Sequence, residues 1–300
     1  DNSTFSLRCE ESVTVLANAI TLTRLLSPWA AFSGGNGTEQ DPYLISSVAD
    51  VLELATISDY TGKYFKQTAD IDMARVWSFQ PAGGSAENAF SGVYDGDGHS
   101  IVGIEFYNAA YEPTGLFRYT DGAIIKNLKL DGFDLKSDQP YLGGFVGYAK
   151  NTTFENCQWN GKLHQRAKVT VEDYENVSSD RNNMGFTGGI AAMAVECIFA
   201  DCVFDGQISA TGKCIGGVTG YARACEISGC SATAASEVYT AYHCGGSIVG
   251  AMTQNSTVSD CSVAGKVCSF DHCGGVTGYL QSGKVEKCVV SSSAMISGRQ

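Results

Sequence analysis

The feature that most limits how this chain can fold is a motif that recurs along it at a nearly constant interval. The motif holds a Gly-Gly pair, a short apolar run, a Gly-Tyr, a polar loop and an Asn-Cys. Aligned positions lie about 28–30 residues apart, with one interval of about 45, and such a period predicts a solenoid. Five full copies span Leu142–Trp159, Thr187–Cys202, Ile215–Cys230, Cys244–Cys261 and Cys273–Cys288, and a degenerate copy spans Thr114–Leu128.

Aligning the copies on their Cys gives columns that are apolar in every copy. The Cys column itself, the column three residues before it and the column two residues after it all have this property. The residue just before the Cys is mostly a turn former. The Cys column consists of Leu128, Cys157, Cys202, Cys230, Cys261 and Cys288.

This pattern predicts an all-β fold, a right-handed parallel β-helix. Short strands joined by Gly and Asn/Asp turns cannot build a helical solenoid, whereas parallel coils stacked about 4.8 Å apart bury their inward columns against one another. Coils of about 28–30 residues are too long for hexapeptide or nonapeptide repeats and suit a wider, three-sided coil. The right hand follows from the usual rule for parallel crossovers.

The repeats divide the chain into two expected regions. Residues 1–33 lie outside the repeat and are expected to be an N-terminal cap or the remnant of a preceding segment. Residues 34–300 are expected to form one β-helix domain, with repeats from about 114 to 290, and Ser47 followed by VADVLELATIS predicts a short capping helix. No polar cap precedes Gln300, so we expect a longer protein or last residues that fold back as a cap.

Charge and hydropathy exclude several classes of partner. The net charge of −12 argues against nucleic acid, whose phosphates require a basic footprint. The sequence has no apolar run of about 18 residues, so it predicts no transmembrane segment. No secretory signal is visible at the start of the sequence.

The 12 cysteines permit three interpretations. Because Leu128 occupies the Cys column in the first copy, a stacked ladder of reduced, buried cysteines is favoured. A disulfide is the second interpretation, since Cys197 and Cys225 lie one coil apart. The third is zinc on an outward column of Cys214, His243 and His272, but neighbours in a strand face opposite sides, so His and Cys are not expected to converge and no metal site is favoured.

The ordered motifs resemble the GLUG-motif repeats of bacterial surface proteins. The resemblance rests on Gly115-Leu116-Phe117, on the Gly-Gly units, and on an upstream block with GGNGTEQDPYLIS, YFKQTADIDM and FSGVYDGDGHSIVGIEF, and it covers about residues 33–290. It implies a right-handed parallel β-helix on a secreted or cell-surface protein, related to large adhesins and to non-catalytic regions of IgA-peptidase-like proteins. Ala192 replaces a motif Gly and Ser247 adds a residue, and both predict local bulges.

The search for chemistry gives no catalytic residue. The four histidines include no HExxH, which excludes a zinc-protease domain of that type within this sequence. No carboxylate stacks on a carboxylate in the exterior columns, as β-helix lyases or hydrolases would need. The weak candidates for a Ca²⁺ site are Asp70, Asp72, Asp95 and Asp97, for which plain Asp-Gly turns are the alternative.

The function expected from sequence is a non-catalytic surface module for adhesion, binding or spacing. The alternative is a β-helix polysaccharide lyase or glycoside hydrolase acting on an extracellular glycan. We expect a monomer without cofactor, whose partner is a host or environmental glycan or protein. The insertion after Leu163 projects as a loop and offers the binding candidates Arg166, Lys168, Tyr174, Arg181 and Asn182.

Overall fold

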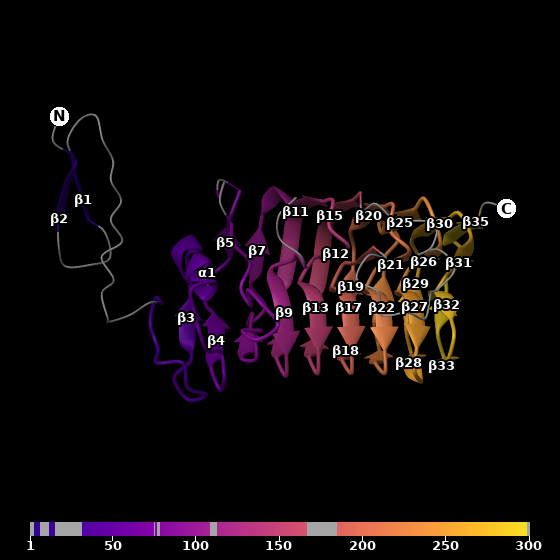
Figure 1. Cartoon of the computed structure of the whole chain (residues 1–300), viewed down its shortest axis with the longest axis horizontal. Coiled ribbons are helices and arrows are strands. Elements are labelled where there is room, and N and C mark those ends of the chain that lie inside the picture. Colours follow the sequence, from indigo (N-terminus) through magenta and orange to yellow (C-terminus); the bar gives the residue numbers. More distant parts are fainter. Residues whose placement is uncertain are drawn as a thin grey trace.

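The protein is a parallel β-solenoid of about 7 turns, with coils of about 29 residues. The computed structural model describes residues 32–298 except 75, 77–78, 109–112 and 167–184, and also the strands β1 (Ser3–Ser6) and β2 (Ser12–Val15), which pair antiparallel. Figure 1 shows the coils stacked in chain order along the long axis, from indigo to yellow. The predicted all-β solenoid is confirmed.

Four parallel sheets run along the described part of the solenoid, and we number them in the order in which a coil passes through them. Sheet 1 contains β12 (Tyr141–Gly143), β16 (Phe186–Gly188), β21 (Cys214–Gly216), β26 (Cys244–Gly246) and β31 (His272–Gly274). Sheet 2 contains β9 (Phe117–Asp121), β13 (Val146–Lys150), β17 (Ala191–Val195), β22 (Thr219–Arg223), β27 (Val249–Thr253) and β32 (Thr277–Leu280).

Sheets 3 and 4 complete each coil. Sheet 3 contains β3 (Tyr43–Ile45), β4 (Tyr64–Gln67), β6 (Val93–Asp95), β10 (Ile124–Lys126), β14 (Thr153–Glu155), β18 (Ile198–Ala200), β23 (Glu226–Ser228), β28 (Ser256–Ser259) and β33 (Gly283–Glu286). Sheet 4 contains β5 (Ile71–Asp72), β7 (Ser100–Val102), β8 (Glu105–Asn108), β11 (Lys129–Ser137), β15 (Gln158–Gln165), β19 (Val203–Phe204), β20 (Gln207–Ala210), β24 (Ser231–Ala232), β25 (Glu237–Thr240), β29 (Ser262–Val263), β30 (Lys266–Ser269), β34 (Val289–Val290) and β35 (Met295–Gly298).

The Gly-Gly pair divides one expected side of the coil into sheets 1 and 2, so the coil has four sheets where three sides were predicted. A Cβ on Gly143 would lie 1.9 Å from the carbonyl oxygen of Val146, within the same corner. A Cβ on Gly144 would lie 2.2 Å from the carbonyl oxygen of Gly189 in the next coil. The first glycine therefore permits the sharp corner, and the second permits close stacking of coils.

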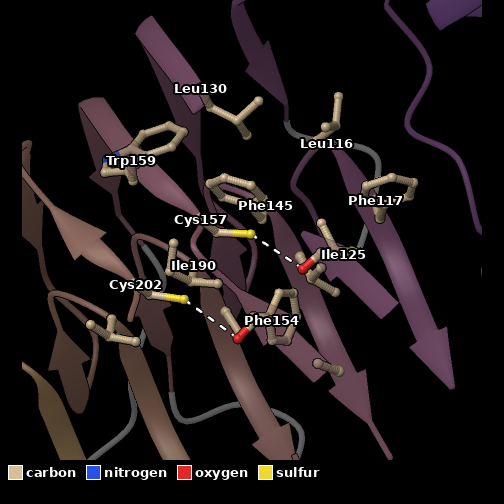
Figure 2. Packing of buried hydrophobic residues seen from close by; sticks show 14 of the residues in the cluster. Leu116, Phe117, Ile125, Leu130, Phe145, Phe154, Cys157, Trp159, Ile190 and Cys202 are labelled. Carbon is tan, nitrogen blue, oxygen red and sulfur yellow. Dashed lines mark hydrogen bonds between the residues drawn. The ribbon is translucent and has the colours of Figure 1, made fainter. Parts of the chain in front are cut away.

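The predicted apolar columns form the core. The apolar column three residues before the Cys is in direct register across sheet 3. In sheet 4, Trp159 pairs with Leu130 and Phe204. Figure 2 shows these side chains pointing toward one another inside the coils, with Cys157 and Cys202 among them. Each such large apolar side chain contributes about 1.5–3 kcal/mol by burial. The sheet 3 column consists of Ile125, Phe154, Phe199, Ile227, Val258 and Val285.

The turn formers before the Cys column adopt left-handed backbone conformations. Asn127, Asn156 and Asp201 have φ of 53°, 50° and 53°. Asn156 Nδ2 donates to Asn127 Oδ1 at 3.0 Å, and Asn127 Nδ2 donates to Asp95 Oδ1 at 3.0 Å. The corner is thus held by a polar ladder outside and by S–H groups inside, since Cys157 Sγ donates to the carbonyl of Ile125 at 3.3 Å.

The predicted capping helix is present as α1 (Val48–Leu54). The Ser47 side chain accepts from the backbone N–H of Asp50, and Val51 and Leu54 are buried against the first coils. Figure 1 places α1 beside β3 at the indigo end of the stack. Among the described residues, no helix has the length and apolar character that crossing a membrane requires.

The two bulges predicted at Ala192 and Ser247 are wrong. Residues on either side of Ala192 keep one register with their partners in both neighbouring coils. In β26, Cys244 pairs with Cys214 and Gly246 with Gly216, so Ser247 takes the place of the second glycine. The additional residue lies in the turn after β27, because Val249 pairs with Thr219, 30 positions away, whereas Val258 pairs with Ile227, 31 positions away. A register shift does occur at Gly132, between Asp131 and Phe133, where φ is 63°.

Candidate functional site

The binding residues predicted in the insertion lie mostly outside the described residues. Lys168, Tyr174, Arg181 and Asn182 belong to the range 167–184. Arg166 is described: it directly follows β15, is exposed, and donates its backbone N–H to Ser137 O at 2.9 Å. A binding role for this segment therefore stays a prediction.

The four aspartates named as Ca²⁺ candidates each have their own donors. Asp70 Oδ1 accepts from the backbone N–H of Ser100 at 2.8 Å, and Asp72 Oδ1 accepts from Ala74 N at 2.9 Å. Asp95 Oδ2 lies 3.4 Å from Lys126 Nζ, and Asp97 Oδ2 lies 3.1 Å from Lys66 Nζ. The backbone contacts fit the alternative named for them, Asp side chains that bond nearby backbone at turns, and the lysine contacts of Asp95 and Asp97 are additional.

A different group of side chains converges at the yellow end of the solenoid. Among the residues that the structure describes, His243, Cys244 and His272 are the group of three potential metal ligands whose ligand atoms all lie within 4.8 Å of one another. Cys244 begins β26 and His272 begins β31, and the two are direct partners in sheet 1. His243 lies in the turn before β26, so strand alternation does not orient it. The argument that His and Cys must face opposite sides is therefore wrong here.

The contacts within this His–Cys cluster are short. His243 Nδ1 lies 2.9 Å from His272 Nδ1 and 3.6 Å from Cys244 Sγ, and the two imidazole rings stack with centroids 4.7 Å apart. Asp271 Oδ2 lies 3.3 Å from His243 Nδ1 and 3.2 Å from His272 Nδ1. The rings of His272 and Tyr279 also pack at nearly a right angle, with centroids 5.3 Å apart.

Backbone hydrogen bonds fix the turn that carries His243. Its carbonyl accepts from the backbone N–H of His272 at 2.7 Å and from Ser269 Oγ at 2.7 Å. Cys244 N donates to the carbonyl of Lys213 at 2.7 Å in the preceding coil. The cluster is therefore anchored to main chain in three successive coils rather than to a single loop.

The electrostatics of the cluster favour charged forms of two members. The hydrogen bond with Cys214, followed by that with His243, lowers the pKa of the Cys244 thiol to about 6 against the effect of burial. The hydrogen bond with Cys244 raises the pKa of His243. Cys244 is fully buried, so its sulfur is closed to a bulky electrophile.

The His–Cys cluster lies at one end of a second apolar group, which is separate from the main core. At the corner between sheets 1 and 2, outward side chains of both sheets pack together. This outer cluster consists of Tyr141, Phe186, Ala192, Met193, Val195, Cys214, Tyr221, Cys244 and Ala251, with Tyr148 and Tyr279 partly buried against it. The outward column of sheet 1 is thus Tyr141, Phe186, Cys214, Cys244 and His272.

Sequence reasoning placed His243 in that outward column, where the structure has Cys244, and it did not consider Asp271. The misleading step was aligning this copy on its Gly-Gly pair. Alignment on Ile248, whose side chain is buried in the core, shifts the copy by one residue and sets Cys244 beside Cys214. The Cys column is buried from Cys157 to Cys261, and Cys288 at its end is partly buried.

Comparisons with known proteins agree on the fold and give partial relatives. No protein-family model matches the chain. It is 29% identical over 146 residues, or 45% of its length, to halomucin of Haloquadratum walsbyi, and 31% identical over 111 residues, or 34%, to a protein of Evansella cellulosilytica provisionally named a Gly-rich membrane protein. The matches span only 2% and 12% of those relatives.

A solved structure shares the architecture over most of the chain. It is a Bacteroides ovatus protein provisionally titled an immunoglobulin A1 protease, with a TM-score of 0.62 and 20% identity. The alignment covers 88% of this chain and 80% of that one. At this identity the likeness shows the solenoid fold and nothing about activity.

Proposed function

We propose that this chain is a non-catalytic module of a secreted or cell-surface protein with GLUG-type repeats, which acts as a binding surface or a stalk. The observation that carries the proposal is the use made of the repeated residues. The glycines form corners and close coil contacts, and the apolar columns and cysteines fill the core. The repeat motif thus builds a scaffold, and its recurring residues are explained without a substrate.

The charged residues outside the coils support the same proposal. Asp95 lies 3.4 Å from Lys126, Asp121 lies 3.5 Å from Lys150, and these partners belong to neighbouring coils. Glu237 and Lys266 pair in the same way at 2.7 Å. An acid–base pair of carboxylates for glycoside cleavage requires two such groups facing each other about 5–10 Å apart across a groove. The carboxylates named here are instead matched with lysines along the solenoid axis.

The names of the partial relatives are compatible with a surface location, since one of them is called a membrane protein. If the protein binds a partner, the insertion after Leu163 is the segment that departs most from the repeat. Loops inserted into a regular coil are where solenoids commonly carry binding residues. We therefore assign the binding role, as part of the proposal, to residues 166–184.

The test is a binding screen with two matched proteins. The full chain and a variant in which a short Gly-Ser linker replaces residues 167–184 are screened against glycan arrays and extracellular matrix proteins. Binding by the full chain that the variant loses supports a binding module, and no binding by either supports a stalk. Release of reducing ends from polysaccharides by the full chain would contradict both and favour a hydrolase or lyase.

A further inference from the structure

We propose that His243, Cys244 and His272 bind a zinc ion that joins two successive coils of the solenoid. The residues come from two copies of the repeat, and His243 and His272 are 29 positions apart. Two imidazole nitrogens and one thiolate form a ligand set that suits zinc and other borderline transition metals, whereas Ca²⁺ and Mg²⁺ prefer oxygen ligands. This inference goes beyond the proposed function, because a stalk or a binding surface needs no metal.

The three ligand atoms lie within 4.8 Å of one another, and two of their spacings are close to those of a tetrahedral site. With Zn–N bonds of about 2.0–2.1 Å and Zn–S bonds of about 2.3 Å, neighbouring ligand atoms lie roughly 3.3–3.6 Å apart. The distance from His243 Nδ1 to Cys244 Sγ is 3.6 Å. The distance between the two Nδ1 atoms is 2.9 Å, so the imidazoles need to separate by only a few tenths of an ångström, roughly 0.4 Å, to admit the ion.

The fourth position is assigned to Asp271. Its Oδ2 lies 3.3 Å and 3.2 Å from the two imidazole nitrogens, which again matches roughly the edge of a coordination tetrahedron with Zn–O bonds of about 2.0–2.2 Å. Asp271 immediately precedes His272, so it belongs to the same turn as a proposed ligand. Its carboxylate also offsets the positive charge that the ion brings.

Burial around the site is graded in a way that suits a bound ion. Cys244 is fully buried and His243 is only 7% exposed, so the inner ligands are shielded from solvent. The side chains of His272 and Asp271 are 42% and 47% exposed, which leaves a path from solvent to the ligand atoms. The backbone contacts of His243 and Cys244 hold the inner ligands in place before the ion arrives.

The contacts within the cluster also explain why a cation fits better than protons alone. Four potential ligand atoms, two nitrogens, a sulfur and a carboxylate oxygen, gather in a small region. Each proton in this region joins only two of these atoms in a hydrogen bond. A divalent ion accepts all four pairs at once.

The first experiment uses Co²⁺ as a spectroscopic substitute for zinc. The chelator-treated full chain is titrated with Co²⁺, and we expect tetrahedral d–d absorption together with a thiolate-to-metal charge-transfer band that saturates at one equivalent. Zinc should displace the cobalt and abolish both features. Absence of the charge-transfer band, with no zinc retained after gel filtration, would overturn the proposal whether or not any variant folds.

Matched variants identify the ligands. Cys244→Ser should remove the charge-transfer band, and Asp271→Asn should weaken zinc binding by about 10–100-fold, with a larger loss for His243→Ala and His272→Ala. The controls are Cys268→Ser, His99→Ala and His164→Ala, which alter residues of the same types outside the cluster and should bind zinc as the unmodified chain does. Far-ultraviolet circular dichroism confirms that each variant is folded. Equal zinc affinity in folded His243→Ala and Cys244→Ser variants would contradict the assignment.

Discussion

At the residue scale, the backbone turns sharply after the sheet 2 strands through a residue in the left-handed conformation, and the type of that residue affects stability. Asn151, Glu196 and Ala224 occupy this corner in successive coils, with φ of 46°, 55° and 52°. Asn tolerates this left-handed region because its short polar side chain bonds locally, whereas Ala and Glu gain nothing there. In the first of these coils Asn151 Nδ2 also donates to Asp121 Oδ1 at 2.9 Å.

Replacing Ala224 by Asn should stabilise the protein. Ala224 is exposed, so the larger side chain meets no core atom. We expect Ala224→Asn to raise the free energy of unfolding by about 0.5–1 kcal/mol, measured by urea denaturation. The matched control is Ala200→Asn in β18, where the backbone is extended and Asn should be neutral or destabilising. Stabilisation by both changes to the same extent would contradict the backbone explanation.

The ionised carboxylate of Asp95 stabilises the folded protein, and this contribution depends on pH. Although burial opposes ionisation, the hydrogen bonds from Asn127 and Asp97 N and the charge of Lys126 lower the pKa of the Asp95 carboxyl. Because the folded pKa lies below the unfolded value of about 3.9, the stabilisation is present above that pH and is lost as pH falls through the folded pKa.

Asp95→Asn should therefore lower the free energy of unfolding by about 1 kcal/mol at pH 7 and by progressively less below about pH 4. Denaturant titrations at several pH values measure this difference. Asp41→Asn, at an exposed carboxylate, is the control and should show little difference at any pH. A difference in the free energy of unfolding between the variant and the unmodified chain that grows as pH falls would contradict this prediction.

At the scale of the element, one of the five full copies has another residue where the others have the second glycine of the Gly-Gly pair, and this coil tests how the coils stack. Ser247 stands in this position, and it is 1% exposed. Its hydroxyl oxygen has no hydrogen-bond partner within the described ranges of the chain. A buried hydroxyl without a partner costs about 1–3 kcal/mol, so this coil is expected to be strained where its neighbours are not.

Ser247→Ala removes only the hydroxyl and should raise the free energy of unfolding by about 1 kcal/mol. The matched control is Ser256→Ala, at a serine that is equally buried but fully bonded. Ser256 Oγ donates to Thr253 O at 2.7 Å and accepts from Cys225 N at 3.1 Å, so its loss should be destabilising by a similar amount. Thermal or urea unfolding measures both variants. If hydrogen bonding decides the effect, the free energy of unfolding rises for Ser247→Ala and falls for Ser256→Ala.

The elements themselves could be predicted from sequence because inward positions are restricted to apolar residues by burial. That restriction gave the columns around Phe154 and Trp159 and their register between coils. The outward position before the paired glycines is buried in all but the last of these coils, but it holds Tyr, Phe, Cys or His in different coils and therefore gives no uniform apolar column. The His–Cys cluster depends on how the turn at His243 folds and on contacts 29 residues apart, which the period of the repeat does not encode.

At the scale of the whole molecule, stability should vary along the stack. Each coil contacts only its neighbours, so a coil with one neighbour is held less firmly than an internal one. The side chains of β34 and β35 are exposed, with Val289 at 64% and Met295 at 62%, whereas β17, β21 and β22 are almost wholly buried.

Hydrogen exchange should follow this gradient in the 300-residue chain. We expect amides of β31–β35 to exchange earliest among the solenoid coils and those of β17, β21 and β22 to exchange last, since local opening needs less free energy where fewer side chains are buried. Mass spectrometry of peptides from each coil measures the order. Uniform exchange across all coils would indicate one cooperative unit instead.

The direction of the sheet hydrogen bonds has a mechanical consequence. Strands in all four sheets lie across the solenoid axis, so the bonds between coils run along it and an axial load stretches them directly. Tension on the two ends should therefore unwind the molecule one coil at a time rather than all at once. Each released coil of about 29 residues would lengthen the chain between the two ends by roughly 100 Å, so the molecule would extend in steps under load.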